Sequence, residues 1–89
     1  PILVTGPFYF AAETAGGGVA STQAAKRRTA KEFVRARRRA GDRAIVFVDG
    51  LEMLDRSQAI GLVDGVHCNS LGFYFNARGL EPHLRRALR

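Results

Sequence analysis

Two short apolar runs stand out along the chain, at residues 2–5 and 44–48. Both are rich in β-branched residues and neither alternates with polar positions, which is typical of strands buried on both faces of a parallel sheet. We therefore expect two parallel strands in a sheet that is covered on both sides. Three aromatic residues follow the first run, at positions 8–10. They are interpreted either as core anchors of a loop or as the wall of an acyl or substrate pocket.

The segment between the two strands has the pattern of an amphipathic helix. Ser21 or Thr22 can cap its start, and Gly41 can end it after residue 40. Apolar positions at helical spacing predict one buried stripe, made of Ala30, Phe33, Val34 and Ala40. Strand, helix and strand in this order predict a right-handed parallel crossover. The glycine-rich residues 15–21 are interpreted as a flexible linker, because they lack the spacing of a phosphate loop.

A second helix is predicted from Asn69 or Ser70 to the end of the sequence. Its apolar positions predict a buried stripe made of Phe73, Ala77, Leu80, Leu84 and Leu88. Gly79 and Pro82 are expected to kink this helix or to divide it in two, because proline removes a backbone donor and crowds the preceding turn. His83 is then expected to be exposed and to take no part in chemistry.

Composition indicates an ordinary globular protein of one domain at most. The 89 residues are 46% apolar and 25% charged. Every apolar run is far shorter than the roughly 20 residues that span a membrane. A single cysteine excludes an internal disulfide and a multi-cysteine zinc site. A cytoplasmic setting fits this cysteine content slightly better, although the compartment stays open.

The net charge of +6 is unevenly distributed. Eight of the fourteen basic residues fall between positions 26 and 39, inside the first predicted helix. Such a charge can mark a nucleic-acid-binding protein, but no nucleic-acid motif accompanies it. A solvated helix face is therefore favoured, and no nucleic-acid partner is expected.

The candidate catalytic residues are Asp64 and His67, in the stretch Asp-Gly-Val-His. A carboxylate three residues before an imidazole, with a glycine between them that lets the backbone bend, can place one oxygen against the ring Nδ1. This is the base-and-orienter half of a nucleophilic triad, with His67 as the base. An ordinary surface loop is the competing interpretation. The position after a predicted strand favours a site, since open α/β sheets carry their sites at the carboxyl ends of strands.

Other polar residues near this stretch are interpreted as structural. Asp49 is expected to cap nearby backbone donors, and Glu52 and Asp55 are expected to be solvated. Cys68 adjoins His67, but neighbours on an extended loop point in different directions, so a cysteine nucleophile is disfavoured. No spacing predicts a metal site or a cofactor.

Residues 64–73 (DGVHCNSLGF), 80–82 (LEP) and 84–88 (LRRAL) resemble the last conserved block and the closing helix of the SGNH (GDSL-type) hydrolases. Residues 1–7 (PILVTGP) are similar to the fourth strand of that family and the loop after it. The resemblance covers nearly the whole chain, but only the C-terminal part of the family's domain. It implies an α/β fold in which residues 1–89 form the strand-helix-strand-loop-helix portion of a flavodoxin-like three-layer α/β/α parallel-sheet domain.

The resemblance also implies a serine esterase that acts on a small-molecule or carbohydrate ester. Asp64 and His67 match the family's catalytic motif, whereas its Gly-Asp-Ser nucleophile block and its oxyanion-hole blocks precede the matching part. None of the serines here lies in such a pattern: Ser21, Ser57 and Ser70. Cys68 stands where many members have proline. The alternative is a non-catalytic α/β fragment or accessory domain that binds a partner through its basic helix.

Overall fold

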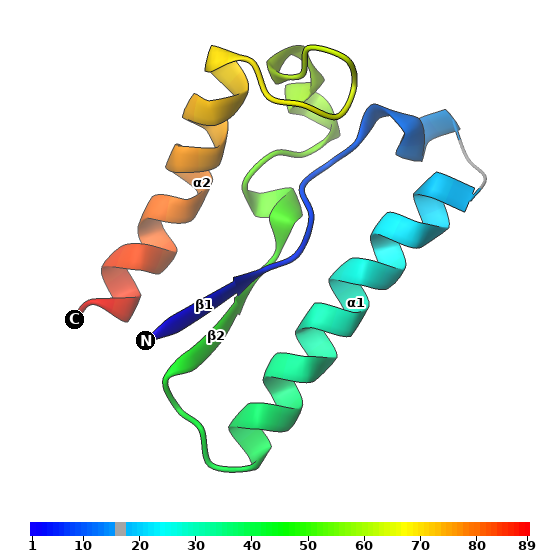
Figure 1. The fold of residues 1–89 in the computed structure, drawn as a ribbon. Helices are drawn as coiled ribbons and strands as arrows, with labels where there is room; N and C mark the ends of the chain where they lie inside the picture. Colours follow the sequence, from blue (N-terminus) through cyan, green and yellow to red (C-terminus); the bar gives the residue numbers. More distant parts are fainter. Residues whose placement is uncertain (16–17) are drawn as a thin grey trace.

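The computed structural model describes residues 1–15 and 18–89, and shows a mixed α/β arrangement with a small parallel sheet (Figure 1). The elements in chain order are β1 (Ile2–Thr5), the 3₁₀ helix η1 (Ala11–Ala15), α1 (Gly18–Arg39), β2 (Ile45–Val48), the 3₁₀ helices η2 (Gly50–Glu52) and η3 (Arg56–Gly61), and α2 (Ser70–Ala87). Figure 1 shows α1 and α2 on opposite sides of the two strands.

The two predicted strands and their parallel pairing are confirmed. β1 and β2 pair in a register that joins Ile2 to Ile45 and Thr5 to Val48. The expected burial on both faces is wrong for Ile2, which is 57% exposed, and for Val46, which is also exposed. A two-stranded sheet leaves one edge of each strand without a neighbour among the described residues, so its apolar side chains are only partly covered.

Helix α1 ends where the sequence predicts and starts earlier. Gly41 adopts a φ of +105° and its N–H donates to the Arg38 carbonyl, while the Asp42 N–H donates to the Arg37 carbonyl. These two bonds form the glycine-ended cap that closes many helices. The helix begins at Gly18 rather than at Ser21 or Thr22. The linker prediction for residues 15–21 is therefore wrong from residue 18 on, and its positions 16–17 lie outside the described residues.

The buried stripe of α1 is only partly the predicted one. Val34 is buried and Ala30 half-buried, but Phe33 is 54% exposed and Ala40 is exposed. The face turned to the sheet carries Gln23, Arg27 and Val34 at spacings of four and seven. Apolar content alone cannot reveal this face, because two of these three side chains are polar.

Helix α2 starts as predicted, with Asn69 as its cap. The Asn69 side chain accepts a hydrogen bond from the Gly72 N–H at 2.9 Å, and Ser70 is the first helical residue. The expected division at Gly79 and Pro82 is wrong, since one helix continues to residue 87.

The predicted buried stripe of α2 is wrong except at Leu80, which is half-buried. Phe73 is 65% exposed, Leu84 42% and Leu88 78%. Contact is made instead through glycines, because a Cβ on Gly72 would overlap the Gly61 carbonyl oxygen and one on Gly79 would overlap the Glu52 carbonyl oxygen. α2 thus approaches η2 and η3 backbone to backbone, and several of its larger apolar side chains stay exposed, among them Phe73, Tyr74 and Leu84.

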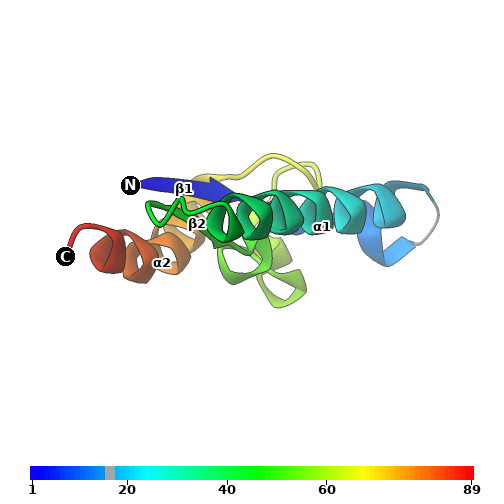
Figure 2. The same cartoon turned by 90° about the horizontal axis from the view of Figure 1, so that it is seen from below.

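The core is small and the molecule is thin. Among the side chains that the structure describes, the buried apolar residues are Tyr9, Val34, Ile45, Val48 and Leu54. The molecule measures 40 × 28 × 15 Å. Figure 2, which is turned by 90° from Figure 1, shows that the molecule is flat. Its radius of gyration of 13.9 Å exceeds the roughly 12 Å expected for a compact chain of this length. Neither helix in the described ranges is both long and apolar enough to cross a membrane.

Candidate active site

Two loops meet at the carboxyl ends of the strands and hold the candidate site. Residues 6–10, the aromatic loop, leave β1, and residues 62–69, the site loop, lead into α2 (Figure 1). Ala11, the residue directly after the aromatic loop, donates its backbone N–H to the Gly65 carbonyl at 2.7 Å. This hydrogen bond links the two loops. Asp64 and His67 therefore lie on the side of the parallel sheet where the strands end, as the sequence predicts. This is the side on which α/β folds carry their sites.

The Asp64 and His67 side chains are hydrogen-bonded as the sequence spacing predicts. His67 Nδ1 lies 2.7 Å from Asp64 Oδ2. The second carboxylate oxygen, Oδ1, accepts from the backbone N–H groups of Val66 at 3.0 Å and His67 at 2.8 Å. The same carboxylate therefore stabilises the turn through one oxygen and orients the imidazole through the other.

Gly65 is required in this turn for two reasons. Its φ is +84°, which residues with a side chain rarely adopt. A Cβ at this position would also press on the Ala11 side chain, where the aromatic loop and the site loop are joined. The glycine between Asp64 and His67 thus allows the backbone bend that brings their side chains into contact, as the sequence spacing suggests.

The electrostatics of the pair fit a base held by a carboxylate. Hydrogen bonds hold the pKa of Asp64 well below its usual range, first the His67 backbone N–H, then the His67 ring and the Val66 N–H. The carboxylate is therefore ionised at neutral pH. An ionised carboxylate against Nδ1 assigns the ring proton to Nδ1 and leaves Nε2 as the acceptor. The His67 side chain is 78% exposed, so Nε2 is accessible.

The base of the site loop is fixed by Asn69. Its side-chain Nδ2 donates to the Ile60 carbonyl at 2.9 Å, and its backbone N–H donates to the Gly61 carbonyl at 2.9 Å. Because the same side chain caps α2, one residue ties the loop to η3 and to the helix.

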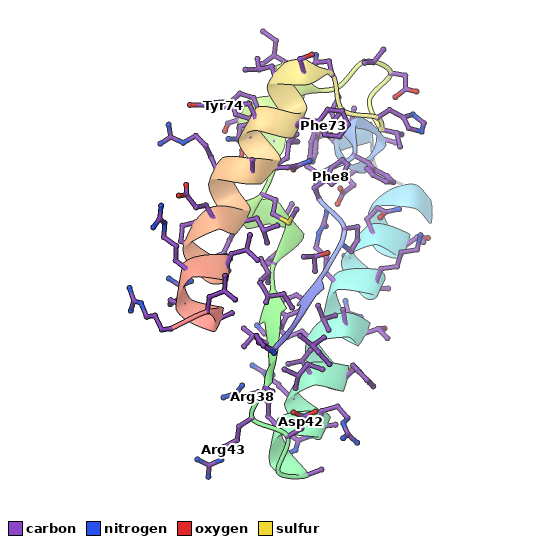
Figure 3. All side chains as sticks on the ribbon, turned by 60° about the vertical axis from the view of Figure 1, so that its left-hand side comes forward. Phe8, Arg38, Asp42, Arg43, Phe73 and Tyr74 are labelled. Atoms are coloured by element: carbon purple, nitrogen blue, oxygen red, sulfur yellow. The ribbon has the colours of Figure 1, made fainter. Side chains whose placement is uncertain are left out.

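A cavity of about 520 Å³ opens beside His67. Its lining residues come from the aromatic loop, the site loop and α2: Pro7, Phe8, Phe10, Val66, His67, Cys68, Phe73 and Asn76. Figure 3 shows Phe8 and Phe73 at the same end of the molecule. Tyr9 is buried instead, with its hydroxyl 3.1 Å from Thr14 Oγ1. The anchor interpretation is therefore confirmed for Tyr9, whereas Phe8 and Phe10 line the cavity and their role in a substrate pocket stays a prediction.

The sequence interpretation missed the ion pair that holds the aromatic loop. Arg27 of α1 donates to both carboxylate oxygens of Glu13, at 2.7 and 2.8 Å, and to the carbonyls of Pro7 and Phe8. Glu13 also accepts from the Phe10 N–H. Both charged side chains are nearly buried, and the hydrogen bond from Arg27 lowers the pKa of Glu13. The sequence gives no signal for this pair, because the apolar pattern does not reveal the sheet-facing side of α1 on which Arg27 lies.

The other acidic residues behave largely as predicted. Asp49 Oδ1 accepts from the Leu51 N–H at 2.9 Å, which confirms its capping role. Asp55 is exposed and also caps a turn, through the Ser57 N–H. Glu52 is exposed but lies 3.0 Å from His83 Nε2. The His83 side chain is only 16% exposed, so its predicted exposure is wrong, because the close approach at Gly79 brings it against η2.

Among the side chains that the structure describes, no hydroxyl or thiol is hydrogen-bonded to His67. Cys68 Sγ accepts from Asn76 Nδ2 at 3.2 Å, and the Ser57 hydroxyl donates to Asp55. The Ser21 side chain is outside the described set. Within residues 1–15 and 18–89, no three His, Cys, Asp or Glu side chains gather as a metal site would need.

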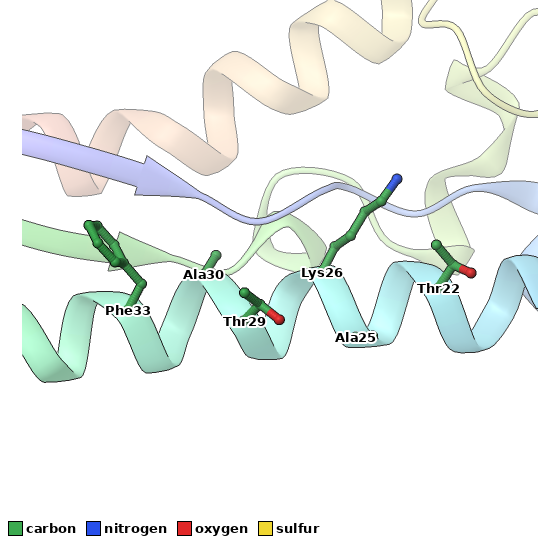
Figure 4. A pocket seen from close by; sticks show the side chains of 6 residues that line it. All are labelled: Thr22, Ala25, Lys26, Thr29, Ala30 and Phe33. Carbon is green, nitrogen blue, oxygen red and sulfur yellow. The ribbon is translucent and has the colours of Figure 1, made fainter.

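A second depression lies along α1 and has no acid–base pair. It measures about 680 Å³, and its lining residues are Thr22, Ala25, Lys26, Thr29, Ala30 and Phe33 (Figure 4). None of them is a carboxylate or an imidazole, so this depression has no group that could act as His67 does in proton transfer.

Comparison of the chain with protein-family models, with curated proteins and with solved structures finds no match.

Proposed function

We propose that residues 1–89 are the C-terminal part of an SGNH-type serine esterase and supply the Asp–His half of its catalytic triad. The observation that carries the proposal is the 2.7 Å contact between Asp64 Oδ2 and His67 Nδ1, beside an apolar cavity at the carboxyl ends of parallel strands. In this proposal the two strands belong to a flavodoxin-like three-layer α/β/α domain. The parallel pairing and the helices on opposite sides of the strands support that placement.

The reaction is acyl transfer to water through an acyl-enzyme. His67 Nε2 takes the proton of a serine hydroxyl from another part of the domain as the serine oxygen bonds to the ester carbonyl carbon. The imidazolium that forms is stabilised by the ionised Asp64 and then protonates the leaving alcohol. In the second half, Nε2 takes a proton from water, which attacks the acyl-enzyme, and the serine leaves with that proton.

The test uses the full protein that contains these residues, with a short-chain aryl ester as substrate. His67→Ala should lower kcat by at least about a thousandfold, because the general base is lost. Asp64→Asn should leave a higher residual rate, since the base remains and only its orientation and charge support are weakened. His83→Ala is the matched control, because this histidine pairs with Glu52 and does not line the cavity. Turnover at the wild-type rate by His67→Ala contradicts the proposal.

A labelling experiment locates the nucleophile in the same protein. A serine-directed phosphonate should inactivate it by modifying a serine outside these 89 residues, as mass spectrometry of the labelled peptide would show. Cys68→Ser and Cys68→Pro should retain most activity, since Cys68 is bonded to Asn76 and takes no part in the mechanism. Label on Cys68 would replace the serine mechanism with a cysteine one.

A second candidate function is supported by α1. Five of its cations have no hydrogen-bond or ion-pair partner in the described part of the chain: Lys26, Arg28, Lys31, Arg35 and Arg39. Lys26 also lines the depression on the same helix. A non-catalytic domain could bind an acidic partner there. The coding sequence upstream of these residues separates the two, because the esterase requires a Gly-Asp-Ser block followed by the oxyanion-hole blocks.

A further inference from the structure

We propose that the cavity beside His67 binds an aromatic group of the ester, so that aromatic esters are the preferred substrates. This assignment rests on the proposed function and adds the substrate class to it. His67 forms part of the cavity wall, so an ester held at His67 Nε2 has its acyl and alcohol groups beside the cavity.

Aromatic rings form much of the cavity lining. Phe8 and Phe10 meet edge to face, with ring centroids 5.8 Å apart and planes at 74°. Phe73 joins them from α2 and is 65% exposed, so a large part of its surface is free to be covered by a ligand. Rings in such an arrangement accept a further aromatic ring by offset stacking or by an edge contact.

Rigidity of the wall favours a defined ligand shape. The carbonyls of Pro7 and Phe8 are held by Arg27, and the Phe10 N–H is held by Glu13. The cavity of about 520 Å³ falls within the usual size range of ligand pockets, which is roughly 300–1,000 Å³. An acetyl group would leave most of this apolar surface in contact with water, whereas a phenyl-bearing group would cover it.

The aromatic group can belong to the acyl part or to the alcohol part, and the experiment has one arm for each. In the full protein, kcat/KM is measured for methyl 3-phenylpropanoate against methyl acetate, and for benzyl acetate against ethyl acetate. We expect a preference for the aromatic ester of at least about tenfold in one arm, as apolar pockets discriminate by such factors. Equal rates within both arms overturn the assignment and leave the esterase proposal standing. Failure to hydrolyse any ester overturns both.

Variants link the preference to the cavity. Phe73→Ala should reduce the aromatic preference to less than about a third of its wild-type value, since one ring of the wall is lost. Leu84→Ala is the control, because Leu84 is exposed on the same helix and does not line the cavity. An unchanged preference in Phe73→Ala contradicts the assignment.

A binding measurement is independent of catalysis. Saturation-transfer NMR with 3-phenylpropanoate should show transfer to its ring protons in the wild-type protein and in Leu84→Ala, and much weaker transfer in Phe73→Ala. Absence of transfer in the wild-type protein, together with absence of benzyl alcohol binding in the same experiment, overturns the assignment even if esters are hydrolysed.

Discussion

The carboxylate of Asp64 serves the backbone and the imidazole at once. One oxygen receives the N–H groups of Val66 and His67, and the other receives the His67 ring. All three donors lie at most three residues after Asp64 in the sequence, so this geometry needs little support from distant parts of the chain. The short contact arises from local turn chemistry, and it depends on the positive φ of Gly65.

The lowered pKa of Asp64 predicts how the turn responds to acid. A carboxylate whose pKa is lower in the folded state stabilises the fold above its unfolded pKa, near 3.9, and loses this contribution as the pH falls through the folded value. A ¹³C NMR titration of the Asp64 carboxyl in the full protein should therefore show a midpoint well below that of an ordinary aspartate. A midpoint at or above 3.9 for Asp64 would show that the hydrogen bonds are not formed in solution.

Arg27 shows how one residue in a charged segment can differ from its neighbours. It lies among the basic residues of α1, but its guanidinium is nearly buried and makes bonds to Glu13, Pro7 and Phe8. The planar, five-donor guanidinium suits this set of acceptors, and a lysine would not replace it. Arg28 next to it has no such partner in the described ranges, so the charge of the helix does not reveal which residue is structural.

At the scale of elements, α2 packs through small residues instead of its apolar stripe. Gly79 lies against η2 so closely that a side chain would collide with the Glu52 backbone. Helix propensity alone predicts that Gly79→Ala stabilises the protein by about 1 kcal/mol. The packing predicts the opposite, a loss of about 1–3 kcal/mol, because the two backbones must separate.

Urea unfolding of the full protein decides the sign of this effect. Ala77→Gly is the matched control, since Ala77 is exposed on the same helix and should lose only the propensity difference, about 1 kcal/mol. A stabilised Gly79→Ala variant would mean that α2 is not in backbone contact with η2.

At the scale of the whole molecule, the described chain leaves much apolar surface exposed. Its accessible surface is 5843 Å², whereas a compact monomer of 9.7 kDa exposes about 5,100 Å². Exposed apolar residues away from the cavity occur on β1, on α1 and on α2, including Ile2, Phe33 and Leu84. A two-stranded sheet with open edges and a core of a few residues does not offset the entropy lost on ordering the chain.

Residues 1–89 expressed alone should therefore not fold into a stable monomer and should not hydrolyse esters. Circular dichroism with a urea titration should show a broad, non-cooperative change or a sample that aggregates. In the esterase proposal, addition of the part of the domain that carries the nucleophile should restore a sharp transition. A cooperative transition in a soluble monomer of the isolated segment would show that its function must be sought in these residues alone.

What the sequence determined by itself was the local structure. The two β-branched runs are strands, Gly41 ends α1, and Asn69 caps α2, because each of these outcomes depends on a few neighbouring residues. The Asp64–His67 contact belongs to the same class, since its two side chains are three residues apart and joined by one turn. The candidate site could therefore be predicted from spacing.

The tertiary structure decided which faces of the helices make contact. Apolar periodicity selected Phe33 on α1 and Leu84 on α2, but both are exposed, because the sheet has two strands and the glycines of α2 allow closer contact than leucines would. The Arg27–Glu13 pair and the aromatic wall beside His67 join segments far apart in the chain. Such contacts depend on how elements are placed in space, which neighbouring residues along the chain do not specify.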